Sequence, residues 1–219
     1  MCVSGFMTPY LSGVFPRRAK HYDQFLTFQN APSIAVEQWK SSLQMLLKKI
    51  TLKCGKPLIV KSPAHTGRIK FLLDMFPDAR FVHIHRDPCV VFQSTVHTHA
   101  AGLPFARLQD TSRLDWTERI IRQYKEVYDA FFEQRALIPD GRFHEMSFEE
   151  LEKDPVGEMR KLYVSLGLPE FETVEPTLRT YLDSLSNYRK NVFPQLTPDV
   201  RRHITSQWER CFEEWGYSL

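Results

Sequence analysis

The chain has 219 residues, of which 42% are hydrophobic and 25% are charged, so it can bury a core and need not be divided into separate domains. Its formal net charge of +3 is too small to indicate nucleic-acid or membrane binding by electrostatics alone. No apolar run reaches membrane-spanning length, and the cationic first thirty residues do not look like a signal peptide.

The cysteines give no sign of a metal site or of a disulfide framework, because they lie far apart and form no C-x-x-C pair. They are Cys2, Cys54, Cys89 and Cys211. This usage fits a reducing compartment, and we expect a cytoplasmic protein without bound metal.

The first half of the chain predicts a helix, a strand, a second helix and a second strand. Residues 1–31 show no clear period and are expected to be irregular, whereas apolar residues recur at helical spacing over residues 32–53. The apolar run 58–60 suits a strand covered on both faces, and a helix over 66–76 leads to a strand at 80–85. This order predicts a β-α-β unit with a parallel sheet.

The second half is predominantly helical. A helix begins at Pro88, a long amphipathic helix covers about 114–134, a strand covers 142–146, and a further helix ends at Gly167. Thr197 begins a last helix whose aromatic face is expected to lie in the core; that face contains Trp208, Phe212 and Trp215. The fold class is therefore α/β, with three layers and a parallel sheet flanked by helices, in one domain over residues 1–219.

The most informative segment is the strand at 80–85 and the helix that follows it. Arg86 stands between them, Asp87 can cap the helix, Pro88 suits its first position, and Ser94 lies nearly two turns in. A guanidinium and a hydroxyl beside a helix N-terminus suit a phosphate group. Taken alone, Arg86 could instead pair with Asp87, and Ser94 could be an ordinary surface hydroxyl.

With these residues the chain resembles the sulfotransferases that use 3'-phosphoadenosine 5'-phosphosulfate, whose fold is related to that of the P-loop nucleotide hydrolases. In that family an arginine at the end of a strand and a serine eight residues later hold the 3'-phosphate, and Arg86 and Ser94 have this spacing. The resemblance covers roughly residues 32–217. It implies that this co-substrate binds here.

Lys61 and His65 are the candidate catalytic residues, because the run Lys-Ser-Pro-Ala-His resembles the Lys-Ser-Pro-x-His of bacterial-type family members. An imidazole can accept the proton of an acceptor hydroxyl, and an ammonium group can offset charge on the sulfuryl oxygens. In isolation, Lys61 would be read as a surface charge and His65 as a loop or capping residue.

Two further segments resemble nucleotide contacts of the family. Arg189 and Lys190 match an Arg-Lys-Gly that closes over the 3'-phosphate, with Asn191 in place of the glycine; alone, they could be a solvated basic loop. Phe148 stands where the family has a tyrosine near the adenine, and its ring can stack on a base but cannot donate a hydrogen bond. It could otherwise be a core aromatic.

Four histidines come in two closely spaced pairs, which raises the question of a metal site. They are His83, His85, His97 and His99. No cysteine or carboxylate set stands nearby at ligand spacing, so we expect His83 and His85 to be packed residues satisfied by neighbouring backbone.

The family's glycine-containing loop, of the type Pro-Lys-Ser-Gly-Thr-Thr, has no counterpart, so the chain looks N-terminally truncated. It is either a truncated product, a divergent relative that binds its donor differently, or an inactive homologue that keeps only the 3'-phosphate half of the site. The leading hypothesis is a sulfotransferase acting on a hydroxyl or amine of a small-molecule or glycan acceptor, without nucleic acid and without a membrane span. The alternative is a catalytically inactive relative that binds a nucleotide or a partner on the same fold. The sequence does not determine the acceptor or the oligomeric state.

Overall fold

The computed structural model describes residues 7–102, 105–110 and 115–219. The chain forms two compact units, one of residues Met1–Pro77 and Thr95–Arg135 and the other of residues Asp78–Ser94 and Ala136–Leu219. We call them the N-terminal unit and the C-terminal unit and describe each by itself. A single domain over residues 1–219 stays a prediction.

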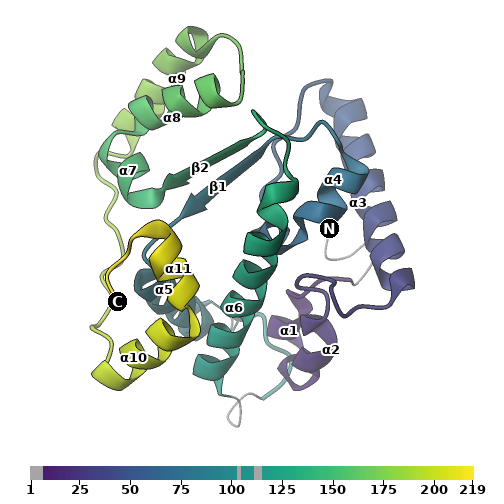
Figure 1. Ribbon diagram of the computed structural model, residues 1–219, viewed down its shortest axis with the longest axis vertical. Helices are drawn as coiled ribbons and strands as arrows, with labels where there is room; N and C mark the ends of the chain where they lie inside the picture. Colours follow the sequence, from purple (N-terminus) through teal and green to yellow (C-terminus); the bar gives the residue numbers. More distant parts are fainter. Residues whose placement is uncertain (1–6, 103–104, 111–114) are drawn as a thin grey trace. The chain divides into compact units, whose positions relative to one another are not determined.

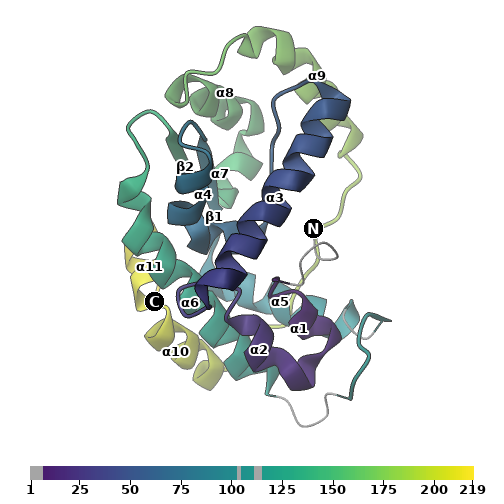
Figure 2. The same cartoon turned by 90° about the vertical axis from the view of Figure 1, so that its right-hand side faces the viewer.

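Within its described residues, the N-terminal unit contains helices and no strand. Its elements are α1 (Leu11–Val14), η1 (Pro16–Arg18), α2 (Ala19–Asp23), α3 (Ser33–Cys54), η2 (Pro63–Arg68), α4 (Ile69–Met75), α6 (Trp116–Gln134) and the second half of α5 (Pro88–Ala101) (Figure 1). Residues 1–31, expected to be irregular, thus contain short helical turns. Figure 2 shows α3, the long helix that the apolar period predicts.

Helix α3 ends where the sequence predicts, and its inner face forms the core of this unit. Gly55 caps it with a left-handed φ of 61°, a conformation that glycine adopts without strain. Trp39 on α3 packs against Phe28 with ring centroids 5.0 Å apart. The guanidinium of Arg68 lies 4.7 Å from the centre of the Phe28 ring and donates to the carbonyl oxygen of Leu26 at 3.0 Å. A buried arginine is thereby satisfied by backbone and by aromatic faces.

The strand expected at residues 58–60 is absent. These residues have no regular secondary structure, and Ile59 is fully exposed. The prediction was wrong because an apolar run becomes a strand only where a neighbouring strand pairs with its backbone, and none does so among the described residues.

The C-terminal unit contains the sheet, which has two strands in the described part of the chain. Its elements are β1 (Phe81–His85), the first half of α5, η4 (Arg135–Leu137), β2 (Phe143–Ser147), α7 (Phe148–Lys153), α8 (Pro155–Ser165), α9 (Phe171–Ser184), α10 (Pro198–Gln207) and α11 (Glu209–Trp215). β1 and β2 pair in parallel, with Phe81 opposite Phe143 and His85 opposite Ser147. The predicted α/β class with a parallel sheet is confirmed, although the strand that pairs with β1 is not the expected one.

The two faces of β1 differ in burial. His83 is 8% exposed, whereas Val82 and Ile84 are each 46% exposed, so only one face of this strand is buried. The covered face packs against α11, where Trp215 stacks on His85. The expected last helix is also divided, because Trp208 leaves helical geometry between α10 and α11. Trp208 and Phe212 are buried, as predicted.

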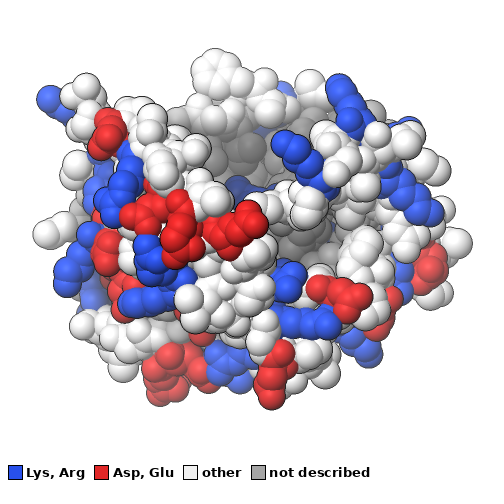
Figure 3. Space-filling view, turned by 90° about the horizontal axis from the view of Figure 1, so that it is seen from above, with Lys and Arg blue, Asp and Glu red and all other residues white. Residues whose placement is uncertain are grey.

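Charged side chains on α8 and α9 alternate in sign at the surface. Arg160 pairs with Glu172 and Glu175, and Arg179 pairs with Glu175. Figure 3 shows basic and acidic side chains interspersed on the face that it displays. This mixture agrees with the small net charge and gives that face no field of a single sign.

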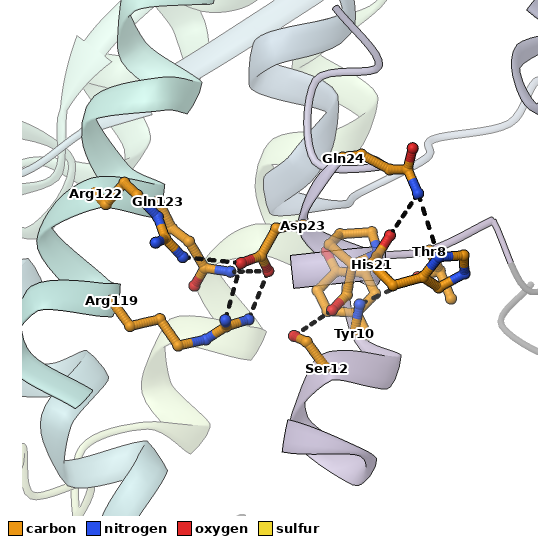
Figure 4. Close-up of polar contacts among 10 residues, drawn as sticks. Thr8, Tyr10, Ser12, His21, Asp23, Gln24, Arg119, Arg122 and Gln123 are labelled. Carbon is orange, nitrogen blue, oxygen red and sulfur yellow. Dashed lines mark hydrogen bonds and ion pairs between the residues drawn. The ribbon is translucent and has the colours of Figure 1, made fainter. Parts of the chain in front are cut away.

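In the N-terminal unit, a buried carboxylate joins α2 to α6. Asp23 is 8% exposed and accepts hydrogen bonds from both terminal nitrogens of Arg119, at 2.9 and 2.6 Å. Arg122 and Gln123 donate to the same carboxylate at 2.9 and 3.0 Å. Figure 4 shows the three donors converging on it from one helix. Each oxygen of this buried carboxylate therefore accepts two hydrogen bonds, which offset the loss of its solvation.

Candidate functional site

The turn from β1 to α5 has the local structure that its sequence predicts. The Asp87 side chain accepts hydrogen bonds from the backbone nitrogens of Cys89 at 2.7 Å and Val90 at 3.4 Å, which satisfies two of the first helical donors. Pro88, which has no such donor, begins the helix. Asp87 is thus occupied as a cap, and Arg86 precedes it at the end of the strand.

Arg86 and Phe148, which the family resemblance implies as nucleotide contacts, touch one another. The Arg86 guanidinium carbon lies 4.3 Å from the centre of the Phe148 ring. The contact follows from the strand register: His85 lies opposite Ser147, so the next residue of each strand leaves the sheet at the same edge. The carboxyl edge of parallel strands is where open α/β sheets bind ligands.

The segment that contains Arg189 and Lys190 is attached to the same part of this unit. Lys190 forms an ion pair of 2.7 Å with Glu152 on α7, and the Gln93 side chain on α5 donates to the carbonyl oxygen of Pro194 at 2.5 Å. Residues 188–197 have no helix or strand, and Arg189 is exposed. Ser94 follows Gln93 in α5, in the second turn of the helix.

A hydrogen-bonded network surrounds the turn at Arg86, and the sequence did not predict it. The Tyr217 hydroxyl lies 2.9 Å from Nδ1 of His85 and donates to Glu149 Oε2 at 2.9 Å. The other oxygen of Glu149 accepts from the backbone nitrogen of Asp87 at 3.3 Å. His83 Nδ1 lies 2.8 Å from Glu145 Oε1. These two histidines are therefore packed as predicted, but side chains rather than backbone satisfy them.

Burial sets the proton affinities in this network. It lowers the pKa of His85, because a charged imidazole loses solvation there. Burial also raises the pKa of Tyr217, and the hydrogen bond to the Glu149 carboxylate raises it further. Near neutral pH the imidazole is neutral and the phenol keeps its proton.

The two candidate catalytic residues belong to the N-terminal unit. Lys61 is exposed and stands in an irregular segment. The sequence had predicted that it closes a strand. His65 lies in η2, where its backbone nitrogen donates to the carbonyl oxygen of Ser62 at 3.0 Å. The predicted site residues thus belong to different units. Lys61 and His65 belong to the N-terminal unit, and the C-terminal unit contains the others, which are Arg86, Ser94, Phe148, Arg189 and Lys190.

The His65 ring is held in an apolar, electropositive environment. It meets Trp39 edge-on, with centroids 6.3 Å apart. Burial, and after it the positive charge of Arg68, lowers the pKa of His65 to about 4, so the ring is neutral at neutral pH. Both ring nitrogens are shielded from solvent and lack a hydrogen-bond partner among the described residues.

The described residues contain no group of three or more histidine, cysteine or carboxylate side chains that could hold a metal ion. Within the same residues, no helix has both the length and the apolar character needed to cross a membrane.

A family model described as the sulfotransferase family matches residues 10–173. Two curated relatives are named omega-hydroxy-beta-dihydromenaquinone-9 sulfotransferase, one from Mycobacterium bovis and one from Mycobacterium tuberculosis. Each is 36% identical over 216 residues, which cover 99% of this chain and 55% of the relative. The chain therefore spans about half the length of these relatives.

The solved structure of sulfotransferase STF9 from Mycobacterium avium is similar in fold, with a TM-score of 0.68 at 24% sequence identity. The similarity covers 94% of this chain and 50% of that one.

Proposed function

The chain belongs to the sulfotransferase family, and on this premise we propose that it transfers a sulfuryl group from 3'-phosphoadenosine 5'-phosphosulfate to an acceptor hydroxyl or amine. The contact between Arg86 and Phe148 carries the proposal. A guanidinium, which can bind a phosphate, and an aromatic ring, which can stack on a base, meet at the carboxyl edge of parallel strands, beside the first turn of a helix.

We assign the nucleotide to the C-terminal unit. Arg86 and Ser94 are proposed to hold the 3'-phosphate, and Phe148 to stack on the adenine. Arg189 and Lys190 are proposed to close over the phosphate. Lys190 already forms an ion pair with Glu152, so phosphate binding would exchange one anionic partner for another.

In the proposed reaction, the acceptor atom forms a bond to sulfur while the bond between sulfur and the 5'-phosphate oxygen breaks. The products are the sulfated acceptor and 3'-phosphoadenosine 5'-phosphate. His65 accepts the proton that leaves the acceptor, and Lys61 offsets negative charge on the sulfuryl and bridging oxygens. The ring is neutral near neutral pH, which is the form that can accept a proton.

The names of the curated relatives favour a hydroxyl over an amine. Both contain an omega-hydroxy compound, and both relatives are 36% identical to this chain. We propose an acceptor with a terminal hydroxyl, and an omega-hydroxylated dihydromenaquinone is the first acceptor to assay.

The experiment that tests this function is a calorimetric titration of the chain with the product nucleotide, 3'-phosphoadenosine 5'-phosphate. We expect a dissociation constant of the order of micromolar for the wild type and loss of measurable binding for Arg86→Ala. The matched control is Arg202→Ala, which removes an exposed arginine of the same unit that pairs only locally with Asp199. It should bind like the wild type.

Absence of binding by the wild type, or equal binding by Arg86→Ala, would contradict the proposal. Tight binding without sulfuryl transfer to any hydroxyl or amine acceptor would instead favour the inactive nucleotide-binding relative. Transfer is measured in the same preparation by the release of 3'-phosphoadenosine 5'-phosphate from the donor.

A further inference from the structure

The last turn of the chain reaches the edge of the sheet at which the nucleotide is proposed to bind. Trp215 at the end of α11 stacks on His85 with the two ring planes 5° apart and the centroids 4.8 Å apart. In Figure 1, α11 lies beside the carboxyl end of β1. Gly216 then adopts a left-handed φ of 66°, which ends the helix and returns the chain toward the sheet. Tyr217 follows it.

The directions of the hydrogen bonds around Tyr217 follow from the chemistry of its partners. A carboxylate can only accept, so the Tyr217 hydroxyl gives its proton to Glu149 at 2.9 Å. Its oxygen is then the acceptor for His85, which must hold its proton on Nδ1, at 2.9 Å. Glu149 also accepts from the Asp87 backbone at 3.3 Å. The result is one chain of donors that ends on a single carboxylate.

This chain of donors includes the sequence neighbours of both Arg86 and Phe148, the two residues in contact. Two of its members, His85 and Asp87, are the neighbours of Arg86 in sequence, and a third, Glu149, is the neighbour of Phe148. No hydrogen bond or ion pair joins the Arg86 guanidinium to another described residue, and the ring of Phe148 is its contact. The arginine is therefore oriented chiefly by the backbone on which it stands.

Holding that backbone has an energetic consequence for ligand binding. A side chain loses rotamer freedom when it is fixed, and a binding site that has already fixed its groups loses less of this freedom on binding. A displacement of the strand end would change both the direction of the guanidinium and its distance from the ring.

We propose that Tyr217 is a positioning residue for the nucleotide site: through Glu149 it holds the turn that directs Arg86 at the 3'-phosphate. The inference rests on the proposed function, because it assumes that Arg86 binds that phosphate. It goes beyond that function in assigning a role to the C-terminal residues, which no sequence motif indicates.

The test compares two nucleotides that differ only in the 3'-phosphate, namely 3'-phosphoadenosine 5'-phosphate and adenosine 5'-monophosphate. The dissociation constant for adenosine 5'-monophosphate divided by that for 3'-phosphoadenosine 5'-phosphate measures how well the protein recognises the 3'-phosphate. In Tyr217→Phe, which keeps the ring and removes the hydroxyl, we expect the first nucleotide to bind about fivefold to tenfold more weakly and the second to change less than twofold. The ratio therefore falls.

The control is Tyr181→Phe, which removes a hydroxyl from a tyrosine that is 59% exposed on α9 in the same unit. It should leave both constants unchanged. Glu149→Gln, which keeps the shape of the side chain and removes its charge, gives a second measurement in case Tyr217→Phe does not fold. It should lower the same ratio.

The outcomes separate the two proposals. If the wild type binds neither nucleotide, or does not prefer the one with a 3'-phosphate, the proposed function fails and this inference fails with it. If the wild type shows the preference and Tyr217→Phe keeps it, only the positioning role fails. Equal weakening of both nucleotides would assign Tyr217 a purely structural role and would also overturn the proposal.

Discussion

His65 shows how far the environment of one side chain determines its chemistry. The ring meets Trp39 edge-on. Burial, and after it the positive charge of Arg68, lowers the pKa of His65 to about 4. The sequence could suggest His65 as a base from its spacing to Lys61, but it gave no information on this shift. The packing of residues distant in sequence causes the shift, and a motif does not record such packing.

If His65 is the general base, its protonation determines the acid limb of the pH profile. Its neutral form, which can accept a proton, is present above its pKa and is lost as the pH falls through about 4. We expect kcat/KM for sulfuryl transfer to stay level from pH 8 down to about 5 as far as this group is concerned. His65→Ala should reduce the rate by about a hundredfold or more.

The control for this variant is His97→Ala, which removes an exposed imidazole and should leave transfer unchanged. A loss of activity centred near pH 6.5, present in the wild type and absent from His65→Ala, would contradict the shifted pKa. Unchanged turnover of His65→Ala would exclude the ring as the base.

Among the elements, helices were predicted better than strands. The period and end signals of α3 and α6 are local, so the sequence contains them in full. Whether residues 58–60 form a strand depends instead on a partner far away in the chain, and the same holds for the pairing of β1 with β2. The break at Trp208 between α10 and α11 has no local signal, since it is neither glycine nor proline.

The junction of α2 and α6 depends on a single carboxylate, and this gives a stability prediction. Replacing Asp23 with alanine leaves Arg119, which is 8% exposed, without its counter-ion. We expect the free energy of unfolding to fall by about 3 kcal/mol or more, because an unpaired buried charge is costly. Urea unfolding followed by circular dichroism measures this change.

Asp129→Ala, on α6, is the matched control. Asp129 pairs with Lys125 at 2.7 Å, but both side chains are about half exposed, so its removal should change stability by about 0.5 kcal/mol or less. Equal effects of the two substitutions would show that burial does not strengthen the Asp23 network.

At the level of the complete chain, the order of motifs in the sequence does not reveal how they are distributed in space. The chain leaves the N-terminal unit at Asp78, returns at Thr95 and leaves again at Ala136. Resemblance to a family supplied the residues Arg86, Phe148 and Lys190, and the parallel register explains why the first two meet. The role proposed for Tyr217 could not be predicted, because it depends on a contact between residues 68 positions apart.

The irregular segment 188–197 makes the proposed closure over the nucleotide accessible to a protease. Trypsin cleaves after arginine and lysine, and Arg189 and Lys190 stand exposed in a stretch without helix or strand, where proteases cut most readily. We expect limited digestion to cut here first in the free protein. Saturation with 3'-phosphoadenosine 5'-phosphate should slow this cut, whereas adenosine 5'-monophosphate should protect much less.

Peptide mass mapping identifies the bond that is cut, and cleavage at an equal rate with and without the nucleotide would contradict the closure. The same two side chains that are proposed to hold the phosphate thus report its presence. The rate of tryptic cleavage in this segment therefore measures how much of the nucleotide site is occupied, without knowledge of the acceptor.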